Sequence, residues 1–337
     1  LLLRVGQENG LLESLVNKAD GTEFFKAPGA APIVIRDESD TWSHGVVNFL
    51  DEKGAFRLEK VFCLEDGSVR KVIRSIYTYG KSRLYQDFMV YRELGYVTVR
   101  VRVDWQEHLS MLKLRFPLQL NYLRASYEIP YGVAQREPNG QEFPVQNFMD
   151  FEGANPGMET GIAGLSIITD TRSSCSTQNK DACVTVLRSP VFAQHEPYQR
   201  REDLEYDYID NGVSEFTYYL YPHCGCWEHG KTVQLARSIL QKPITLFETY
   251  HEGPLPQHRS FVQVTGGHAL LNVMKQAEDG SGDVILRLYE TAGIGGRTEV
   301  ALPFLETAVQ LEFTPWEIKT VRIDAAGQWR ETDMLER

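Results

Sequence analysis

The sequence predicts an all-β protein, and three observations lead to this prediction. Residues 97–104 alternate strictly, so that Val97, Val99, Val101 and Val103 are expected to face inward and Thr98, Arg100, Arg102 and Asp104 to face out. Residues 216–221 alternate with large side chains on both faces, which is typical of a strand in the middle of a thick β-structure. Residues 261–323 hold a series of short apolar segments separated by turns, the pattern of a small sandwich.

The first half of the chain reads as a succession of hairpins. Turn residues at 17–21 (NKADG), 65–67 (EDG) and 93–95 (ELG) separate apolar segments that alternate or are β-rich. The strands expected here lie at residues 11–16, 23–25, 33–35, two within 56–79, 84–91, 96–105 and 110–116. Pro117 and, later, Pro222 are expected to end strands, because proline cannot donate to a central ladder.

The second half continues the β pattern and indicates where a second domain begins. Further β-segments are expected at 127–136, 143–150, 164–170 and 183–187, followed by 261–264, 269–276, 284–290, 298–302, 308–313 and 317–323. Residues 231–240 are the best helix candidate. Glycine, proline and histidine at 250–260 indicate a linker. We therefore predict a large domain at 1–249, a linker at 250–260 and a small sandwich at 261–337.

Composition excludes some classes of function. The chain of 337 residues is 42% hydrophobic, which is globular and long enough for two domains. Its net charge of −11 disfavours nucleic acid as a partner, and no apolar run approaches the roughly 20 residues of a membrane helix. Five cysteines, an odd number, favour a reducing, cytoplasmic compartment. Because residues 1–5 read as the middle of a strand, with no initiator Met, we expect the chain to be part of something longer.

The segment 223–229 (HCGCWEH) is the most tempting place for a metal. Its thiols and imidazoles are ligand types that zinc accepts. The spacing argues against this, because a single residue separates Cys224 from Cys226. We expect these cysteines to fill core, His223 and His229 to be partly exposed, and no metal to bind.

A polar loop at residues 37–45 (DESDTWSHG) is the first candidate for binding sugar. Trp42 could supply an aromatic platform, and Asp37, Asp40 and His44 could supply partners for hydroxyl groups. The alternative is that Trp42 merely anchors the loop on the core.

Tyr131, Arg136 and Gln146 form a second candidate group for sugar binding. They lie in another polar and aromatic region, although Arg136 could equally be a surface ion-pair residue. No H-x-D, H-E-x-x-H, G-x-S-x-G or P-loop motif occurs, and nothing among 46 acidic residues selects a catalytic pair. We therefore assign no catalytic residue.

Several short segments, in this order, resemble the C-terminal β-domains of glycoside hydrolase family 38, the α-mannosidases. They are 103–108 (VDWQEH), 112–114 (LKL), 116–117 (FP), 127–132 (YEIPYG), 144–147 (PVQN), 187–190 (LRSP), 215–218 (EFTY), 221–223 (YPH), 286–290 (LRLYE) and 315–320 (PWEIKT). One departure is Phe148, where the family usually has Trp, while Asp150 two places on does match. Phe keeps the aromatic face but loses the indole donor.

The resemblance implies a large β-supersandwich of the galactose mutarotase-like kind, followed by a smaller Ig-like sandwich. In that family zinc, the Asp nucleophile and the acid/base residue lie in an N-terminal α/β domain, which nothing here matches. The resemblance thus implies that this chain packs against a zinc-dependent catalytic domain of the same parent chain. It would lend some side chains to a cleft for mannose-containing carbohydrate.

Two other functions stay open at the level of sequence. The same sandwich could be a stand-alone carbohydrate-binding module. Less directly, by analogy of fold, it could be an aldose mutarotase, which would need a His and a Glu together on the concave sheet face. His108 or His223 could supply the imidazole.

Overall fold

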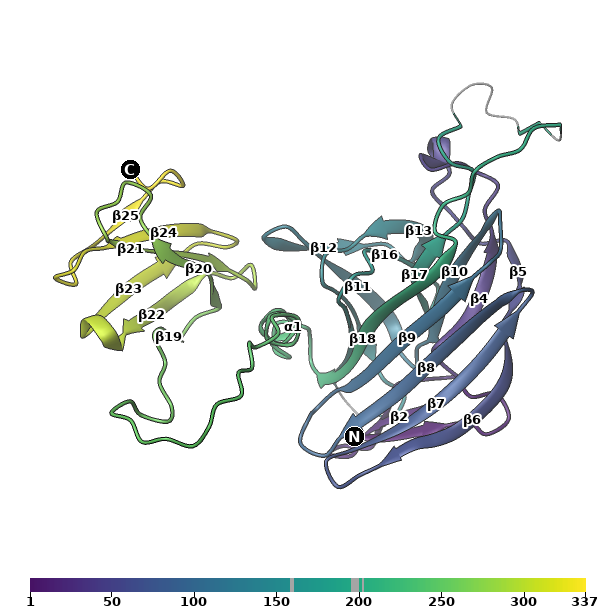
Figure 1. The fold of residues 1–337 in the computed structure, drawn as a ribbon, viewed down its shortest axis with the longest axis horizontal. Coiled ribbons are helices and arrows are strands. Elements are labelled where there is room, and N and C mark those ends of the chain that lie inside the picture. Colours follow the sequence, from purple (N-terminus) through teal and green to yellow (C-terminus); the bar gives the residue numbers. More distant parts are fainter. Residues whose placement is uncertain (158–160, 195–199, 202) are drawn as a thin grey trace. The chain divides into compact units, whose positions relative to one another are not determined.

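The computed structural model describes residues 1–157, 161–194, 200–201 and 203–337. These fall into two compact units, which we call the large unit and the small unit. The large unit comprises Leu1–Ile129 and Ala134–Thr232, and the small unit comprises Pro130–Val133 and Val233–Arg337 (Figure 1). No helix among the described residues has the length and apolar character needed to cross a membrane.

The largest layer is a nine-stranded sheet in the order β12-β11-β14-β15-β18-β9-β8-β7-β6. Its neighbours from β11 to β6 pair antiparallel, and short turns join β6 to β7, β7 to β8 and β8 to β9. Its strands are β6 (Arg57–Asp66), β7 (Arg70–Tyr79), β8 (Ser82–Tyr91), β9 (Val97–Trp105), β11 (Asn121–Ile129), β12 (Gly132–Arg136), β14 (Phe148–Ala154), β15 (Ile162–Thr169) and β18 (Gly212–Cys224).

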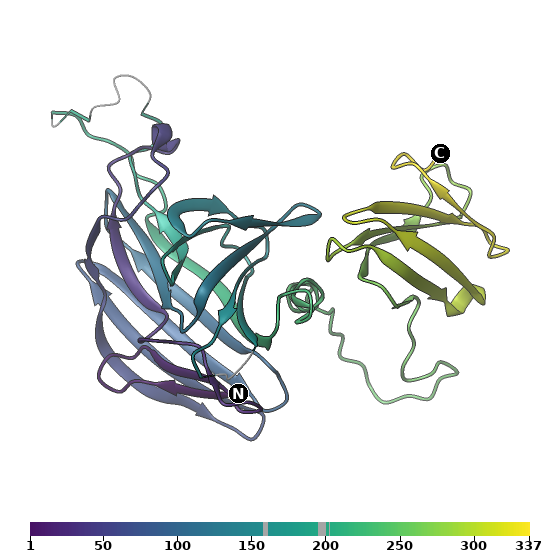
Figure 2. The same cartoon turned by 180° about the vertical axis from the view of Figure 1, so that it is seen from behind.

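Two further sheets complete the large unit. A six-stranded sheet has the order β13-β16-β17-β10-β4-β5, and a small sheet has the order β1-β2-β3. Figure 2 shows the purple N-terminal strands lying in front of the blue strands of the nine-stranded sheet. The strands are β1 (Leu2–Val5), β2 (Leu12–Asn17), β3 (Thr22–Glu23), β4 (Ala31–Arg36), β5 (Glu52–Ala55), β10 (Ser110–Pro117), β13 (Asn139–Pro144), β16 (Ser174–Gln178) and β17 (Asp181–Arg188).

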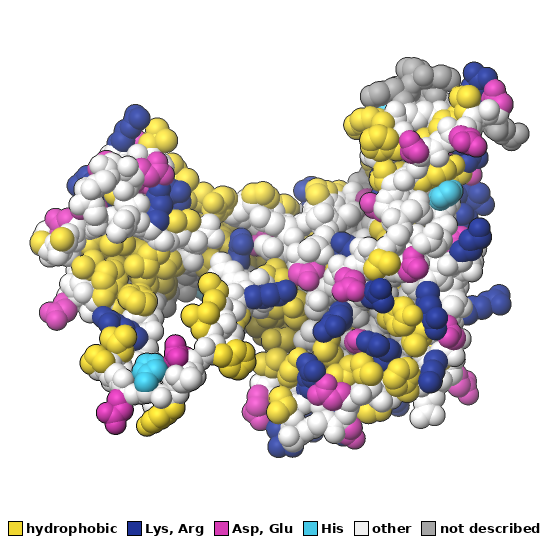
Figure 3. Space-filling view, viewed as in Figure 1, with side chains coloured by type: hydrophobic (Ala, Val, Ile, Leu, Met, Phe, Trp, Pro, Cys, Tyr) yellow, Lys and Arg dark blue, Asp and Glu magenta, His cyan; other side chains and the backbone are white. Residues whose placement is uncertain are grey.

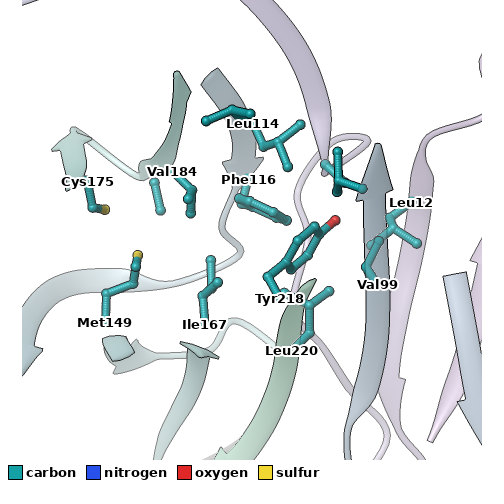
Figure 4. Close-up of a cluster of buried hydrophobic side chains, with 14 of the residues drawn as sticks. Leu12, Val99, Leu114, Phe116, Met149, Ile167, Cys175, Val184, Tyr218 and Leu220 are labelled. Atoms are coloured by element: carbon teal, nitrogen blue, oxygen red, sulfur yellow. The ribbon is translucent and has the colours of Figure 1, made fainter. Parts of the chain in front are cut away.

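The core of the large unit lies between these layers. Val99, Tyr218 and Leu220 of the nine-stranded sheet face Leu114 and Phe116 of the six-stranded sheet (Figure 4). All are at most 1% exposed, so each removes nearly its whole side chain from water. The predicted alternation is confirmed along β9, where Val97, Val99, Val101 and Val103 are fully buried while Arg100, Arg102 and Asp104 are exposed.

Three expectations about strand limits are wrong. Pro222 does not end β18, which continues to Cys224 and pairs Pro222 with Leu165 of β15. The proline is tolerated because pairing with β9 stops at Leu220, so no donor is needed on that side. The segment 127–136 is a hairpin rather than one strand, and Tyr131 forms its turn with φ of 56°. The segment 143–150 likewise holds the end of β13 and the start of β14 rather than one strand.

The small unit is a sandwich of a three-stranded sheet, β19-β22-β23, and a four-stranded sheet, β20-β21-β24-β25. Leu286 and Val321 from one sheet pack with Val300, Leu311 and Phe313 from the other. The strands are β19 (Gln263–Thr265), β20 (Ala269–Gln276), β21 (Val284–Glu290), β22 (Gly296–Leu302), β23 (Thr307–Phe313), β24 (Ile318–Ile323) and β25 (Trp329–Thr332). The all-β prediction, a large sandwich followed by a small one, is confirmed.

Helical structure is sparse. The helix α1 (Thr232–Leu240) matches the predicted helix, and two 3-10 turns, η1 (Ser43–Gly45) and η2 (Pro303–Leu305), are one turn each. Between α1 and β19, residues 243–253 and the predicted linker 250–260 have no helix or strand. The predicted domain limits at 249 and 261 stay a prediction.

Candidate functional site

The loop that follows β4 brings together the first group of predicted sugar-binding residues. The Oδ1 atom of Asp40 accepts a hydrogen bond from the Trp42 amide at 2.9 Å, and its Oδ2 atom lies 2.7 Å from Nε2 of His44. This carboxylate is 4% exposed, and it fixes a turn in which Ser43 and His44 have positive φ. The spacing i, i+2, i+4 thus produces one local cluster, the Asp40 loop, defined as residues 37–45.

Trp42 presents its ring at the surface of this loop. The side chain is 52% exposed, and its ring centre lies 6.3 Å from that of His44 at an angle of 51°. The half-exposed ring leaves apolar area open to a sugar face, while its backbone is held by Asp40. This geometry, with an imidazole beside the ring, fits a platform role for Trp42 in sugar binding.

Arg188 at the end of β17 holds the Asp40 loop from beneath, and sequence reasoning did not select it as a site residue. Its Nε donates to Oδ2 of Asp37 at 2.8 Å, and its Nη2 donates to Ser39 Oγ at 2.7 Å and to the Asp40 carbonyl at 3.3 Å. The guanidinium also lies 4.8 Å from the ring centre of Phe49. Asp37 is therefore a buried ion-pair partner that positions the loop, rather than a group open to ligand.

Each of the three residues in the second predicted sugar-binding group has different local contacts. Tyr131 belongs to the small unit, where its ring meets Tyr289 edge-on at 5.3 Å. Arg136 lies over the Phe143 ring at 5.0 Å, and the exposed Gln146 donates its amide hydrogen to the Glu128 carbonyl at 2.9 Å. Arg136 and Gln146 belong to the large unit, so the predicted group is divided between the two units, and its role in sugar binding stays a prediction.

The expectation for the segment 223–229 is wrong about which residues are buried. His223 is buried, with Nε2 2.7 Å from Oδ2 of Asp150, whereas Cys224 is exposed and its thiol donates to Asp20 at 3.1 Å. Alternation puts His223 on the face of β18 opposite to core residues such as Leu220, and Gly164 and Gly230 lie against its imidazole there, which buries it. Cys224, the last residue of the strand, is exposed. Burial lowers the pKa of His223, but the charge of Asp150 and the hydrogen bond to it outweigh burial and raise that pKa.

The geometry around the two histidines gives no support to a mutarotase site. His223 is only 5% exposed, so a sugar ring cannot reach its imidazole. His108 is stacked on Tyr208, with the two ring centres 3.8 Å apart and the planes inclined by 9°.

One group of possible metal ligands stands out in the described part of the chain. Ligand atoms of Glu152, Cys226 and Glu228 lie within 4.8 Å of one another. Burial, together with the charge of Asp150, raises the pKa of Glu152. Burial and the neighbouring Glu228 carboxylate raise the pKa of the Cys226 thiol.

Comparison with known proteins extends over most of the chain. Residues 1–196 match the family described as glycosyl hydrolases family 38 C-terminal domain. "Alpha-mannosidase G" of Dictyostelium discoideum is 24% identical over 306 residues, which are 85% of this chain and 26% of that protein. "Alpha-mannosidase 2C1" of Homo sapiens is 28% identical over 222 residues, which are 63% of this chain and 19% of that protein. The chain thus spans about a quarter or less of the length of these relatives.

A solved structure shares the fold. The crystal structure of an alpha-mannosidase from Enterococcus faecalis V583 superposes with a TM-score of 0.76 at 14% identity. The similarity covers 95% of this chain and 41% of that one, so it includes both sandwiches. Together with the family match over more than half of the sequence, these findings show that the chain belongs to the glycosyl hydrolase family 38 C-terminal domain family.

Proposed function

We propose that this chain is the C-terminal portion of an α-mannosidase-like glycoside hydrolase. It would support, and partly line, the sugar cleft of an N-terminal zinc-dependent catalytic domain of the same protein. The lengths of the relatives support this, because the chain spans 26% and 19% of two proteins named as α-mannosidases. Retaining hydrolysis through a covalent glycosyl intermediate would take place in that other domain.

The observation that carries the proposal is a stretch of exposed apolar side chains, which we call the apolar segment (residues 244–250). Ile244, Leu246, Phe247 and Tyr250 are 91%, 85%, 101% and 98% exposed, and the segment has no regular secondary structure. Figure 3 shows hydrophobic side chains protruding along this part of the chain. Contiguous apolar exposure of this kind marks an interaction site. We infer that the catalytic domain of the parent chain covers it.

Activity measurements test the proposal directly. The purified chain is expected to release nothing from an aryl α-mannoside, with or without added zinc, because the catalytic residues belong to the other domain. Zinc-dependent release by the chain alone would contradict the proposal.

Association measurements test the role of the apolar segment. The substitutions Phe247→Ser and Tyr250→Ser should weaken binding of this chain to the N-terminal part of the parent protein in a pull-down. Tyr122→Ser is the matched control, since Tyr122 is 94% exposed but lies outside the segment. Equal binding by all variants would argue against the apolar segment as the contact.

A second function is favoured by the Asp40 loop, where Trp42, His44 and Asp40 lie together. The chain could bind mannose-containing carbohydrate by itself. Calorimetry with mannose and oligomannosides separates this from purely structural support, because binding gives saturable heat that Trp42→Ala should remove. If the unmodified chain gives no heat of binding, the supporting role is the function that remains.

A further inference from the structure

A mixed group of thiol, imidazole and carboxylate side chains lies where the turn after β18 meets β14. Cys226 and Glu228 come from the turn and Glu152 from β14, with ligand atoms within 4.8 Å of one another. The Nδ1 atom of His229 lies 3.0 Å from Sγ of Cys226. We propose that Glu152, Cys226 and Glu228 bind one Zn²⁺ ion, and that His229, which contacts the Cys226 thiol, turns toward them to supply a further ligand. This site is separate from the catalytic zinc expected in the other domain.

The backbone of the turn brings three of the four ligands together. Gly225 has φ of 74° and donates to the Ile162 carbonyl at 2.7 Å, which fixes the start of the turn beside the first residue of β15. The Gly230 amide then donates to the Cys226 carbonyl at 3.1 Å, closing a helical turn. Cys226 and His229 are therefore three residues apart on one turn, a spacing that places two side chains on the same face.

The fourth ligand, Glu152, is fixed in position by contacts that leave it able to bind a metal. It is 1% exposed, it forms an ion pair with Arg124, and its Oε2 atom accepts a hydrogen bond from the Trp227 amide at 3.2 Å. A carboxylate oxygen has two lone pairs, so Oε2 can accept this bond and still coordinate an ion.

Charge and hydrogen bonding both favour a cation here. Glu152 and Glu228 place two carboxylates beside one thiol, while Arg124 supplies a single positive charge. The Oε2 atom of Glu228 is buried and accepts no hydrogen bond from the described residues. A buried oxygen without a donor is costly, and a bound cation would satisfy it.

The donor set selects the kind of metal. Thiolate, imidazole nitrogen and carboxylate oxygen are the ligands of Zn²⁺, and a thiol and an imidazole disfavour Mg²⁺ and Ca²⁺. Four protein ligands make a closed site of the structural type, which would join β14 to the turn that leads into α1. Spacing within the segment 223–229 disfavours a metal held by that segment alone, but Glu152 comes from outside it.

The test uses the 337-residue chain, freed of metal by dialysis against a chelator. Calorimetric titration with Zn²⁺ should show one equivalent bound, with a rise in the unfolding temperature. Co²⁺ in place of Zn²⁺ should give the absorption band of a thiolate-bound ion. Cys226→Ser and His229→Ala should each lower the affinity at least tenfold, and Cys226→Ser should also remove the thiolate band.

Cys224→Ser is the matched control, because its thiol lies two residues earlier, is exposed and faces Asp20. This variant should bind Zn²⁺ as the unmodified chain does. Circular dichroism should confirm that every variant is folded before its affinity is interpreted. The proposal is overturned if the chain binds no Zn²⁺, if Cys226→Ser binds it unchanged, or if loss of binding follows Cys224 instead.

Discussion

The two units bury apolar residues in the same way, but their most deeply buried carboxylates are held differently. The large unit pairs buried side chains across long stretches of sequence, as in Asp37 with Arg188 and Asp150 with His223. In the small unit the buried carboxylate of Glu290 is held by backbone amides instead, those of Ala292, Gly293 and Trp316 at 2.8, 2.8 and 2.9 Å. A carboxylate that accepts hydrogen bonds from backbone amides, an arrangement we call a backbone cradle, fixes the conformation of the loops carrying those amides. An ion pair between side chains instead requires two strands distant in sequence to meet in register.

This difference predicts how each unit responds to substitution. Removing one partner of a buried ion pair leaves a charge without compensation, which costs more than losing a neutral hydrogen bond. The large unit should therefore be the more sensitive of the two to single charge changes, and the size of each change should follow burial.

The largest effect is expected at Lys113 and Glu142 of the large unit. Lys113 is 2% exposed, and its Nζ donates to Ser176 Oγ at 3.0 Å and to the Phe49 carbonyl at 3.2 Å while forming an ion pair with Glu142. Glu142→Ala should lower the free energy of unfolding by about 3–5 kcal/mol, because Lys113 stays buried without its counter-charge. Denaturant titration measures the loss.

The double variant Lys113→Met with Glu142→Leu is the control for this prediction. Replacing both charges by apolar groups of similar size is often neutral, so most of the stability should return. If the double variant is as unstable as Glu142→Ala, the buried charge is not the cause.

The second prediction concerns the backbone cradle of the small unit. Glu290→Ala should cost about 2–3 kcal/mol, because three amides lose their acceptor, and the damage should be confined to the small unit. Hydrogen exchange read peptide by peptide gives the location. Glu312→Ala, at a side chain 75% exposed in the same unit, is the control and should leave exchange unchanged. Faster exchange in β9 or β18 would contradict the separation of the two units.

The contrast between local and distant pairing also explains what sequence could predict. The valines of β9 and the grouping of Asp40, Trp42 and His44 follow from spacings of two and four residues, which local structure fixes. Arg188 beside Asp37 could not be predicted, because that contact depends on the register of strands 151 residues apart.

The burial of His223 is a second contact between distant strands that local sequence could not predict. Its burial against Asp150 needs a glycine opposite it, because a Cβ at Gly164, its partner across the β15–β18 pair, would lie 2.1 Å from the imidazole Cε1. Nothing in the segment 223–229 alone reveals this space. The periodicity of the sequence thus predicts that a strand is present, but it does not predict which residue of the neighbouring strand faces His223.

The third prediction is a pH dependence restricted to the large unit. Asp150 and Glu152 face His223 and raise its pKa despite burial, and Tyr221 lies against the ring. A raised pKa in the folded state means that the stabilisation is complete below the unfolded value of about 6.5 and is lost as pH rises through the folded value. The loss of unfolding free energy should be smaller than that caused by Glu142→Ala or Glu290→Ala, since both His223 and Asp150 remain and only a proton leaves.

Hydrogen exchange across this pH range, corrected for intrinsic rates, measures the loss. Protection near β15 and β18 should fall as pH rises, while the small unit, which buries no histidine among its described residues, serves as the internal reference. His223→Gln should remove the slope. A slope that persists in this variant would assign the pH dependence to another group.

The smallest effect is expected on the outer face of the nine-stranded sheet, where basic and acidic side chains are interspersed (Figure 3). Arg83 and Glu59 form an ion pair of 2.6 Å with 45% and 43% of their side chains exposed. Arg83→Ala should cost less than about 1 kcal/mol, because water and salt screen such a pair, and added salt should shrink the difference further. Lys113 and Arg83 belong to the same unit and both contact a carboxylate, so burial is the main difference between them. A loss at Arg83 equal to that at Glu142 would show that pairing itself, rather than burial, sets the sensitivity of the large unit.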